Sequence, residues 1–149
     1  MNTITGRIIV MTVSLLGMVG CAGERPQNLG SKEGLLQVCP SSPNCVSSQA
    51  DDGKHRIAPL VFSGDPDAAF ARLKQVLGRR GDTTIIEENA GYLRVELRTV
   101  LFVDDGEFLL DRERNVIHLR SASRIGYSDL GKNRGRLEEL RRDFEKAGQ

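Results

Sequence analysis

The pattern of apolar and polar residues changes twice along the chain and divides it into three parts. A run of apolar or small residues occupies positions 8–20. Residues 21–36 are rich in Gly, Pro, Gln, Asn and Ser and show no apolar periodicity. Such a stretch can bury little surface, which is typical of a tether. Residues 37–149 carry regularly spaced apolar positions and therefore predict one small folded domain.

The folded part is predicted to begin with a strand and a helix. Residues 56–62 contain apolar positions suited to one strand. Asp65 and Pro66 predict the start of a helix, because aspartate caps free N–H groups and proline suits the first helical position. Gly78 is the predicted end. The apolar residues expected to face the core from these two elements are Ile57, Leu60, Phe62, Phe70, Leu73, Val76 and Leu77.

Residues 83–124 predict four further strands joined by short turns. Turns are expected at residues 89–91, 104–106 and 112–115, where turn-forming residues cluster. The Asp-Gly pair at positions 105 and 106 favours the positive φ angles of a tight hairpin. The four predicted strands are residues 83–87, 92–103, 107–110 and 116–124.

A closing helix is predicted from the apolar stripe of Leu137, Leu140 and Phe144. The predicted order of elements is therefore β-α-β-β-β-β-α. Successive strands joined by short turns pair in antiparallel fashion, and two helices can cover one face of their sheet. We expect a single two-layer α+β domain.

The apolar run at residues 8–20 is too short for a comfortable transmembrane helix, which needs roughly 20 apolar residues. It has the length of a signal-peptide core. Residues 18–21, Met-Val-Gly-Cys, resemble the lipobox of bacterial lipoproteins, although Met18 replaces the usual leucine. We expect residues 1–20 to be a signal peptide and Cys21 to carry palmitate and other acyl chains, which would hold the protein at the membrane. The alternative is an ordinary secretory signal cleaved near Ala22.

These features predict a lipoprotein of the cell envelope that faces the periplasm. Ala22 does not resemble the aspartate that retains enterobacterial lipoproteins at the inner membrane, so we expect the outer membrane. The charge is nearly balanced, with 21 basic and 20 acidic residues, and the chain has no tryptophan. Both facts argue against a nucleic-acid partner.

Cys39 and Cys45 are predicted to form a disulfide, because an exported protein matures in an oxidising compartment. A metal site or a Cys/His nucleophile is the alternative. His55 and His118 are the only histidines in the chain, so a zinc site would need an unusual set of ligands. We expect no metal and no cofactor.

The clearest candidate for ligand binding lies near the C-terminus. Alternation on a strand places His118, Arg120 and Arg124 on one face, and guanidinium groups suit phosphate or carboxylate oxygens. Residues 126–136 then supply turns and the start of the last helix, where free N–H groups favour an anion. The predicted anion site comprises Arg120, Arg124, Tyr127, Asn133 and Arg134.

A structural alternative explains the same arginines. Arg120, Arg124, Arg134 and Arg136 could form ion pairs with the acidic residues Asp104, Asp105, Glu107 and Asp129.

Three separated motifs resemble the domain-of-unknown-function family 1499. They are residues 39–48 (Cys-Pro-Ser-Ser-Pro-Asn-Cys-Val-Ser-Ser), residues 102–108 (Phe-Val-Asp-Asp-Gly-Glu-Phe), and residues 120–131 (Arg-Ser-Ala-Ser-Arg-Ile-Gly-Tyr-Ser-Asp-Leu-Gly) with Asn133 and Arg134. The resemblance runs from about residue 36 to the end of the last helix. It implies an uncharacterised domain found in bacterial envelope and plastid proteins, and it supplies no activity or catalytic residues.

Our leading hypothesis is a non-enzymatic envelope lipoprotein that binds an anionic small molecule, a lipid headgroup or a peptide carboxylate. A second hypothesis is an envelope hydrolase or transferase. Its base would be His118 or Asp129, and its nucleophile would be Ser121, Ser123 or Ser128. A third is a structural partner in an envelope protein complex.

Overall fold

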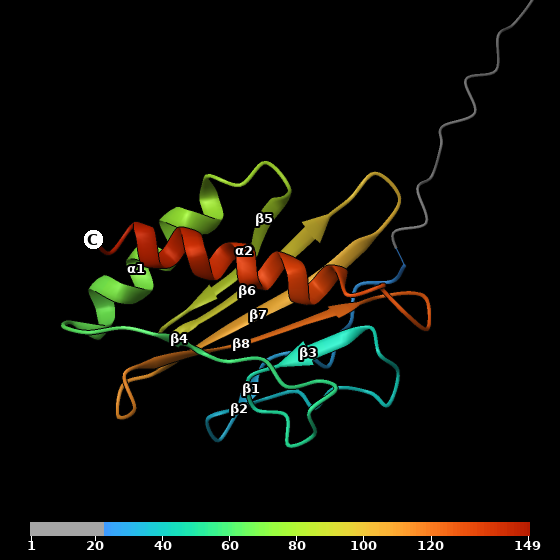
Figure 1. The fold of residues 1–149 in the computed structure, drawn as a ribbon, viewed down its shortest axis with the longest axis horizontal. Helices are drawn as coiled ribbons and strands as arrows, with labels where there is room; N and C mark the ends of the chain where they lie inside the picture. The colour runs from blue at the N-terminus through green and yellow to red at the C-terminus, as the bar shows by residue number, and fades with distance from the viewer. Residues whose placement is uncertain (1–22) are drawn as a thin grey trace, which may run out of the picture.

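Two helices cover one face of an antiparallel sheet in the computed structural model, which describes residues 23–149 (Figure 1). The sheet has six strands in the order β3-β8-β7-β6-β5, and β4 pairs with β8 beside β3. The predicted α+β class and antiparallel sheet are confirmed. The elements are β1 Ser31–Lys32, β2 Leu35–Leu36, β3 Cys45–Ser47, β4 Leu60–Val61, α1 Pro66–Gly78, β5 Thr83–Asn89, β6 Tyr92–Arg98, β7 Val103–Asp111, β8 Val116–Ser123 and α2 Lys132–Lys146.

The first helix begins and ends where its local sequence predicts. The Asp65 carboxylate accepts a hydrogen bond from the Ala68 N–H at 2.9 Å, and Pro66 occupies the first helical position. Both features stabilise the first turn of the helix, where backbone N–H groups have no partner within the helix. They need no tertiary contact, since the cap is made within one turn. The helix ends at Gly78.

The hairpin predicted at residues 104–106 is wrong. The β6–β7 turn lies earlier, at residues 99–102, where the Thr99 N–H donates to the Phe102 carbonyl at 2.9 Å. Asp104, Asp105 and Gly106 instead lie inside β7. A Cβ on Gly106 would lie 2.8 Å from Cγ2 of Val95, so glycine is required here by strand packing and not by a turn.

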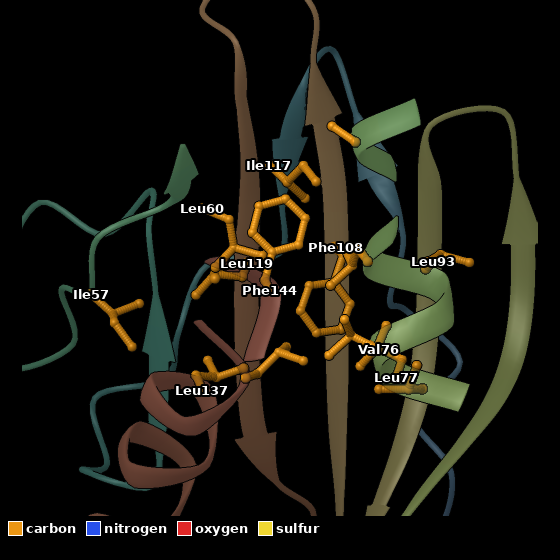
Figure 2. Close-up of a cluster of buried hydrophobic side chains, with 14 of the residues drawn as sticks. Ile57, Leu60, Val76, Leu77, Leu93, Phe108, Ile117, Leu119, Leu137 and Phe144 are labelled. Atoms are coloured by element: carbon orange, nitrogen blue, oxygen red, sulfur yellow. The ribbon is translucent and has the colours of Figure 1, made fainter. Parts of the chain in front are cut away.

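The apolar core lies between the sheet and the two helices (Figure 2). Alternate residues of β6, β7 and β8 point into it, as the pleat of a strand requires. The predicted core residues Ile57, Leu60 and Phe62 are buried there. The core side chains of the three central strands are Leu93, Val95, Leu97, Phe108, Ile117 and Leu119, and those of the helices are Ala69, Leu73, Val76, Leu77, Leu137, Leu140 and Phe144.

The opposite face of the sheet is covered by the N-terminal segment, residues 23–36, which the sequence predicts to be a tether. Arg25 donates to Glu96 on β6 at 2.6 Å, and the Gly30 N–H donates to Glu107 on β7 at 2.9 Å. Leu36 is buried, and its N–H donates to the Gln49 side chain. The segment therefore lies against the sheet, held mainly by polar contacts.

The predicted signal peptide and Cys21 lie outside the described residues. Among residues 23–149, neither helix has the length and apolar character needed to cross a membrane.

Candidate functional site

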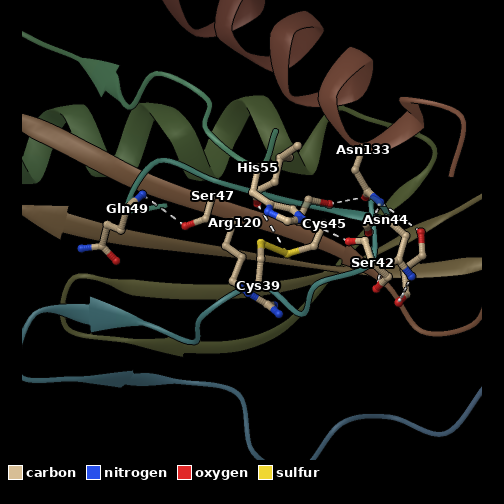
Figure 3. Close-up of a disulfide and its surroundings, with 12 residues drawn as sticks. Cys39, Ser42, Asn44, Cys45, Ser47, Gln49, His55, Arg120 and Asn133 are labelled. Atoms are coloured by element: carbon tan, nitrogen blue, oxygen red, sulfur yellow. Dashed lines mark hydrogen bonds between the residues drawn. A yellow bond between two sulfur atoms is a disulfide. The ribbon is translucent and has the colours of Figure 1, made fainter. Parts of the chain in front are cut away.

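A disulfide joins Cys39 to Cys45, as predicted, with the two Cα atoms 5.7 Å apart (Figure 3). Cys45 begins β3 and is buried, whereas Cys39 lies in the preceding loop. The loop is also held by His55, whose Nδ1 lies 2.9 Å from Asp52 and whose Nε2 lies 3.1 Å from the Ser42 carbonyl. In the described part of the chain, no three His, Cys, Asp or Glu side chains group as a metal site would require.

Asn133 joins the disulfide loop to β8 and α2. Its side chain accepts from the Ser121 hydroxyl at 2.5 Å, and its amide donates to the Asn44 carbonyl and to the Ser123 hydroxyl. Asn133 is fully buried, so these bonds replace the water that its amide loses. Asn133 therefore holds three elements together, and its amide is already occupied.

The face of the sheet away from the helices carries six buried charged side chains, which we call the charged layer. Arg120 donates to Glu107 at 3.0 Å, and Arg124 contacts both Asp105 and Glu96 at 2.7 Å. Arg94 lies 3.4 Å from Asp105. Three arginines thus balance three carboxylates. Arg120 in β8 and Arg124 just after it therefore form the ion pairs that the structural alternative predicts. The charged layer comprises Arg94, Glu96, Asp105, Glu107, Arg120 and Arg124.

The ion pairs shift the pKa values of Glu96 and Arg124. Burial alone would raise the pKa of Glu96, but hydrogen bonds from Arg124 and Arg25 lower it to about 2. The Asp105 carboxylate raises the pKa of Arg124 through its hydrogen bond, against the effect of burial. Burial and the charge of Glu107 raise the pKa of Tyr92, whose hydroxyl donates to Glu107 at 2.9 Å. The shifts keep Glu96 ionised and Arg124 charged at neutral pH, and they keep Tyr92 a neutral donor.

The structure does not bring the five residues of the predicted anion site together. Arg120 and Arg124 belong to the charged layer, and Asn133 lies on the helix side of the sheet. Tyr127 is 74% exposed in the loop between β8 and α2. Arg134 donates to the carbonyls of Lys54 and Arg56. Anion binding by this set stays a prediction.

His118 has partners other than those of the hydrolase hypothesis. Its Nδ1 lies 3.1 Å from the Ser48 hydroxyl and its Nε2 lies 3.6 Å from Asp111. The Ser48 oxygen also accepts the Leu119 N–H at 3.0 Å, which joins the residue after β3 to β8. Neither of the two hollows described below is lined by these three side chains.

A groove of about 880 Å³ opens at one end of the sheet, between the β6–β7 loop, the β8–α2 loop and the start of α2. A smaller hollow of about 420 Å³ lies between the ends of α1 and α2. The apolar side chains that line the groove are Val100, Phe102, Ile125 and Leu130, and its cationic side chains are Arg98, Lys132 and Arg136.

The four carboxylates that line the groove are already engaged, whereas some of its cationic groups are not. Nη1 of Arg136 donates to Asp104 at 2.7 Å, but Nη2 is buried and has no hydrogen-bond partner among the described residues. Lys132 forms no ion pair with any residue between 23 and 149. The partners of the carboxylates are Arg80 for Asp82 and Glu139, Arg136 for Asp104, and the backbone N–H groups of Gly131 and Asn133 for Asp129.

Sequence reasoning missed the groove for two reasons. Residues 100–102 are apolar and predict a continuous strand, so the sequence does not show that they form an exposed loop. The predicted anion site does not include Lys132 or Arg136, and Arg136 enters the sequence analysis only as a candidate for an ion pair. A usable signal was Leu130, an apolar residue between Asp129 and Gly131 in a stretch of turn formers.

Residues 35–144 match a family of proteins described as "Protein of unknown function (DUF1499)", so the match covers more than half of the chain. It includes the disulfide loop, the three central strands and nearly all of α2, and it begins after most of the N-terminal segment. No curated protein and no solved structure matches the chain.

Proposed function

The chain belongs to the DUF1499 family of proteins of unknown function, and from this premise we propose that it is an envelope lipoprotein whose groove binds an anionic lipid. The phosphate-bearing headgroup would contact Arg136 and Lys132, and the acyl portion would lie against the apolar walls.

The size and walls of the groove support a ligand of this kind. Its volume of about 880 Å³ falls within the range of about 300–1,000 Å³ that is usual for small-molecule sites. Val100 and Leu130 on its rim are 99% and 95% exposed. Covering such side chains releases about 1.5–3 kcal/mol each, which favours a ligand with an apolar portion.

The unpaired N–H of Arg136 is the observation that carries the proposal. A buried donor without a partner costs about 1–3 kcal/mol, and an anionic oxygen would remove that cost once the guanidinium turned Nη2 toward the groove. Lys132 adds a positive charge that no side chain between residues 23 and 149 neutralises. Asp104 and Asp82 engage Nη1 and Nε of Arg136, so only its Nη2, together with Lys132, is left for a phosphate.

The N-terminal sequence supports attachment to a membrane. Cys21 follows the apolar run and lies two residues before Gly23 in the sequence. Gly23 is the first residue that the structure describes. A Cβ on Gly23 would lie 3.0 Å from Cγ2 of Ile125, which lines the groove. An acylated Cys21 would therefore hold the groove close to lipid.

Binding in the groove can be tested by native mass spectrometry of the purified protein in a mild non-ionic detergent. We expect one bound phosphatidylglycerol per protein and weaker binding of phosphatidylcholine. Lys132→Ala should weaken phosphatidylglycerol binding about 10-fold or more, since contacts to charged groups contribute about 1.5–3 kcal/mol. Lys74→Ala is the matched control, because Lys74 pairs with Glu88 away from the groove. Equal binding of both lipids, or no effect of Lys132→Ala, would refute the proposal.

The anchor has its own test. Metabolic labelling with a palmitate analogue should mark the wild-type protein and should not mark Cys21→Ser. Labelling that survives this substitution would exclude acylation at Cys21.

A further inference from the structure

Most of the large apolar side chains that the described protein exposes gather at one end of the sheet. Of the nine exposed large hydrophobic residues, six lie in the β6–β7 loop or the β8–α2 loop. The other three, Leu35, Val38 and Val61, lie elsewhere in the chain. We call residues 99–102 and 124–131 together the loop end; its six exposed apolar residues are Val100, Leu101, Phe102, Ile125, Tyr127 and Leu130.

The two loops leave the sheet at neighbouring positions, because of the register between β7 and β8. Asp104 pairs with Ser123, so the residues just before β7 and just after β8 lie side by side. Both loops line the groove, and Figure 1 shows them at the same end of the sheet. Their exposed apolar residues therefore form one surface.

The described chain begins at the loop end. A Cβ on Gly23 would lie 2.9 Å from Cβ of Arg124 and 3.0 Å from Cγ2 of Ile125. Cys21 precedes Gly23 by two residues in the sequence. Residues 8–20 form the apolar run that precedes it. The apolar run of the sequence is thus followed closely by the residue at which the described fold begins, and that residue lies beside the loop end.

We propose that the loop end docks directly onto the lipid bilayer, with side chains of both loops inserted at its surface. Val100 and Leu130 are almost wholly exposed to water, and Tyr127 is an amphipathic aromatic residue suited to the interface. Arg98 and Lys132 stand beside them and would face anionic headgroups. The proposal rests on the membrane attachment proposed above, and it does not require a lipid in the groove.

The absence of tryptophan from the chain allows a direct test. The variant Leu130→Trp would carry one tryptophan whose fluorescence reports the surroundings of the β8–α2 loop. The variant Leu101→Trp would do the same for the β6–β7 loop. Val61→Trp is the matched control, since Val61 is 70% exposed but pairs with Val116 at the opposite end of β8. The full protein is reconstituted into phosphatidylcholine–phosphatidylglycerol vesicles, with and without bromine on the acyl chains.

We expect the emission of Trp at positions 130 and 101 to shift to shorter wavelength on vesicles and to be quenched by the brominated lipids. Trp at position 61 should do neither. The proposal is overturned if the protein does not float with vesicles, if neither loop probe is quenched, or if the control is quenched as strongly as the loops. Loss of phosphatidylglycerol binding in native mass spectrometry, with the quenching intact, would instead refute the groove alone.

Discussion

The two faces of the central sheet are built from the same strands, but one packs against the helices through apolar contacts and the other packs against the N-terminal segment through polar and ionic contacts. On the helix face, β7 and β8 contribute apolar side chains such as Phe108 and Leu119 to a continuous core. On the other face, the neighbouring positions on these strands carry Glu107 and Arg120, which pair with each other under the N-terminal segment. Successive residues of a strand point to opposite faces of the sheet. Neighbouring positions on one strand therefore make an apolar contact on one face and an ionic contact on the other.

This difference implies that substitutions on the two faces reduce the stability of the fold by different amounts. Apolar packing is non-directional, so a side chain of similar volume can replace another at small cost. A buried charge depends on its particular partner, because removing one member leaves the other ionised and desolvated. The charged layer should therefore be the more sensitive face, although it contributes less apolar burial.

The largest expected effect follows from Arg124→Met. This change leaves the buried carboxylates of Glu96 and Asp105 without their shared partner. We expect the free energy of unfolding in urea to fall by about 3–5 kcal/mol, as when other buried pairs are broken. On the helix face, the matched control Leu119→Met should cost less than about 1.5 kcal/mol. Equal losses for the two variants would mean that the faces do not differ as described.

A second, smaller effect concerns pH. Ion pairing lowers the pKa of Glu96 from its ordinary value of 4.5 to about 2. Its contribution is complete above about pH 4.5 and is lost as the pH falls through about 2, because the unfolded chain binds the proton first. The shift corresponds to about 3 kcal/mol at most. Between these pH values, the unfolding free energy of Glu96→Gln should depend on pH less steeply than that of wild type. Parallel curves would contradict the ion-pair account of Glu96.

The smallest effect is expected at the edge of the charged layer. Arg25 also pairs with Glu96, but its side chain is about half exposed and Glu96 keeps Arg124 and Arg98. Arg25→Ala should therefore lower the unfolding free energy by less than about 1 kcal/mol. Hydrogen exchange should quicken at the Gly30 amide, whose bond to Glu107 helps to hold the same segment. A loss as large as that of Arg124→Met would show that the segment is a main support of the sheet.

Features decided by nearby residues could be predicted from the sequence. The start of α1 depends on Asp65, Pro66 and the Ala68 N–H within one turn, and the disulfide joins cysteines in one short loop. The hairpin at residues 104–106 was mispredicted because its local Asp-Gly signal was overridden by distant partners. Arg136 and Arg124 bind the two aspartates, and Val95 packs against Gly106.

The candidate site was harder to predict because it has no local motif. The groove exists only because β7 pairs with β8, which brings residues 99–102 beside residues 125–131. Alternation correctly predicted that Arg120 and Arg124 share a face, yet their carboxylate partners lie on neighbouring strands. Sequence could therefore indicate cationic residues, but it could not tell which of them are already neutralised.

The central claim is that the groove binds an anionic lipid at Arg136 and Lys132. Its most direct test is the mapping of amide chemical-shift changes by NMR as dihexanoyl phosphatidylglycerol is added below its micelle concentration. We predict that the largest saturable changes occur at Val100, Leu130, Lys132 and Arg136, and that dihexanoyl phosphatidylcholine causes smaller ones. Changes centred on Arg94 and Arg120 in the charged layer, or no saturable change in the groove, would contradict the claim.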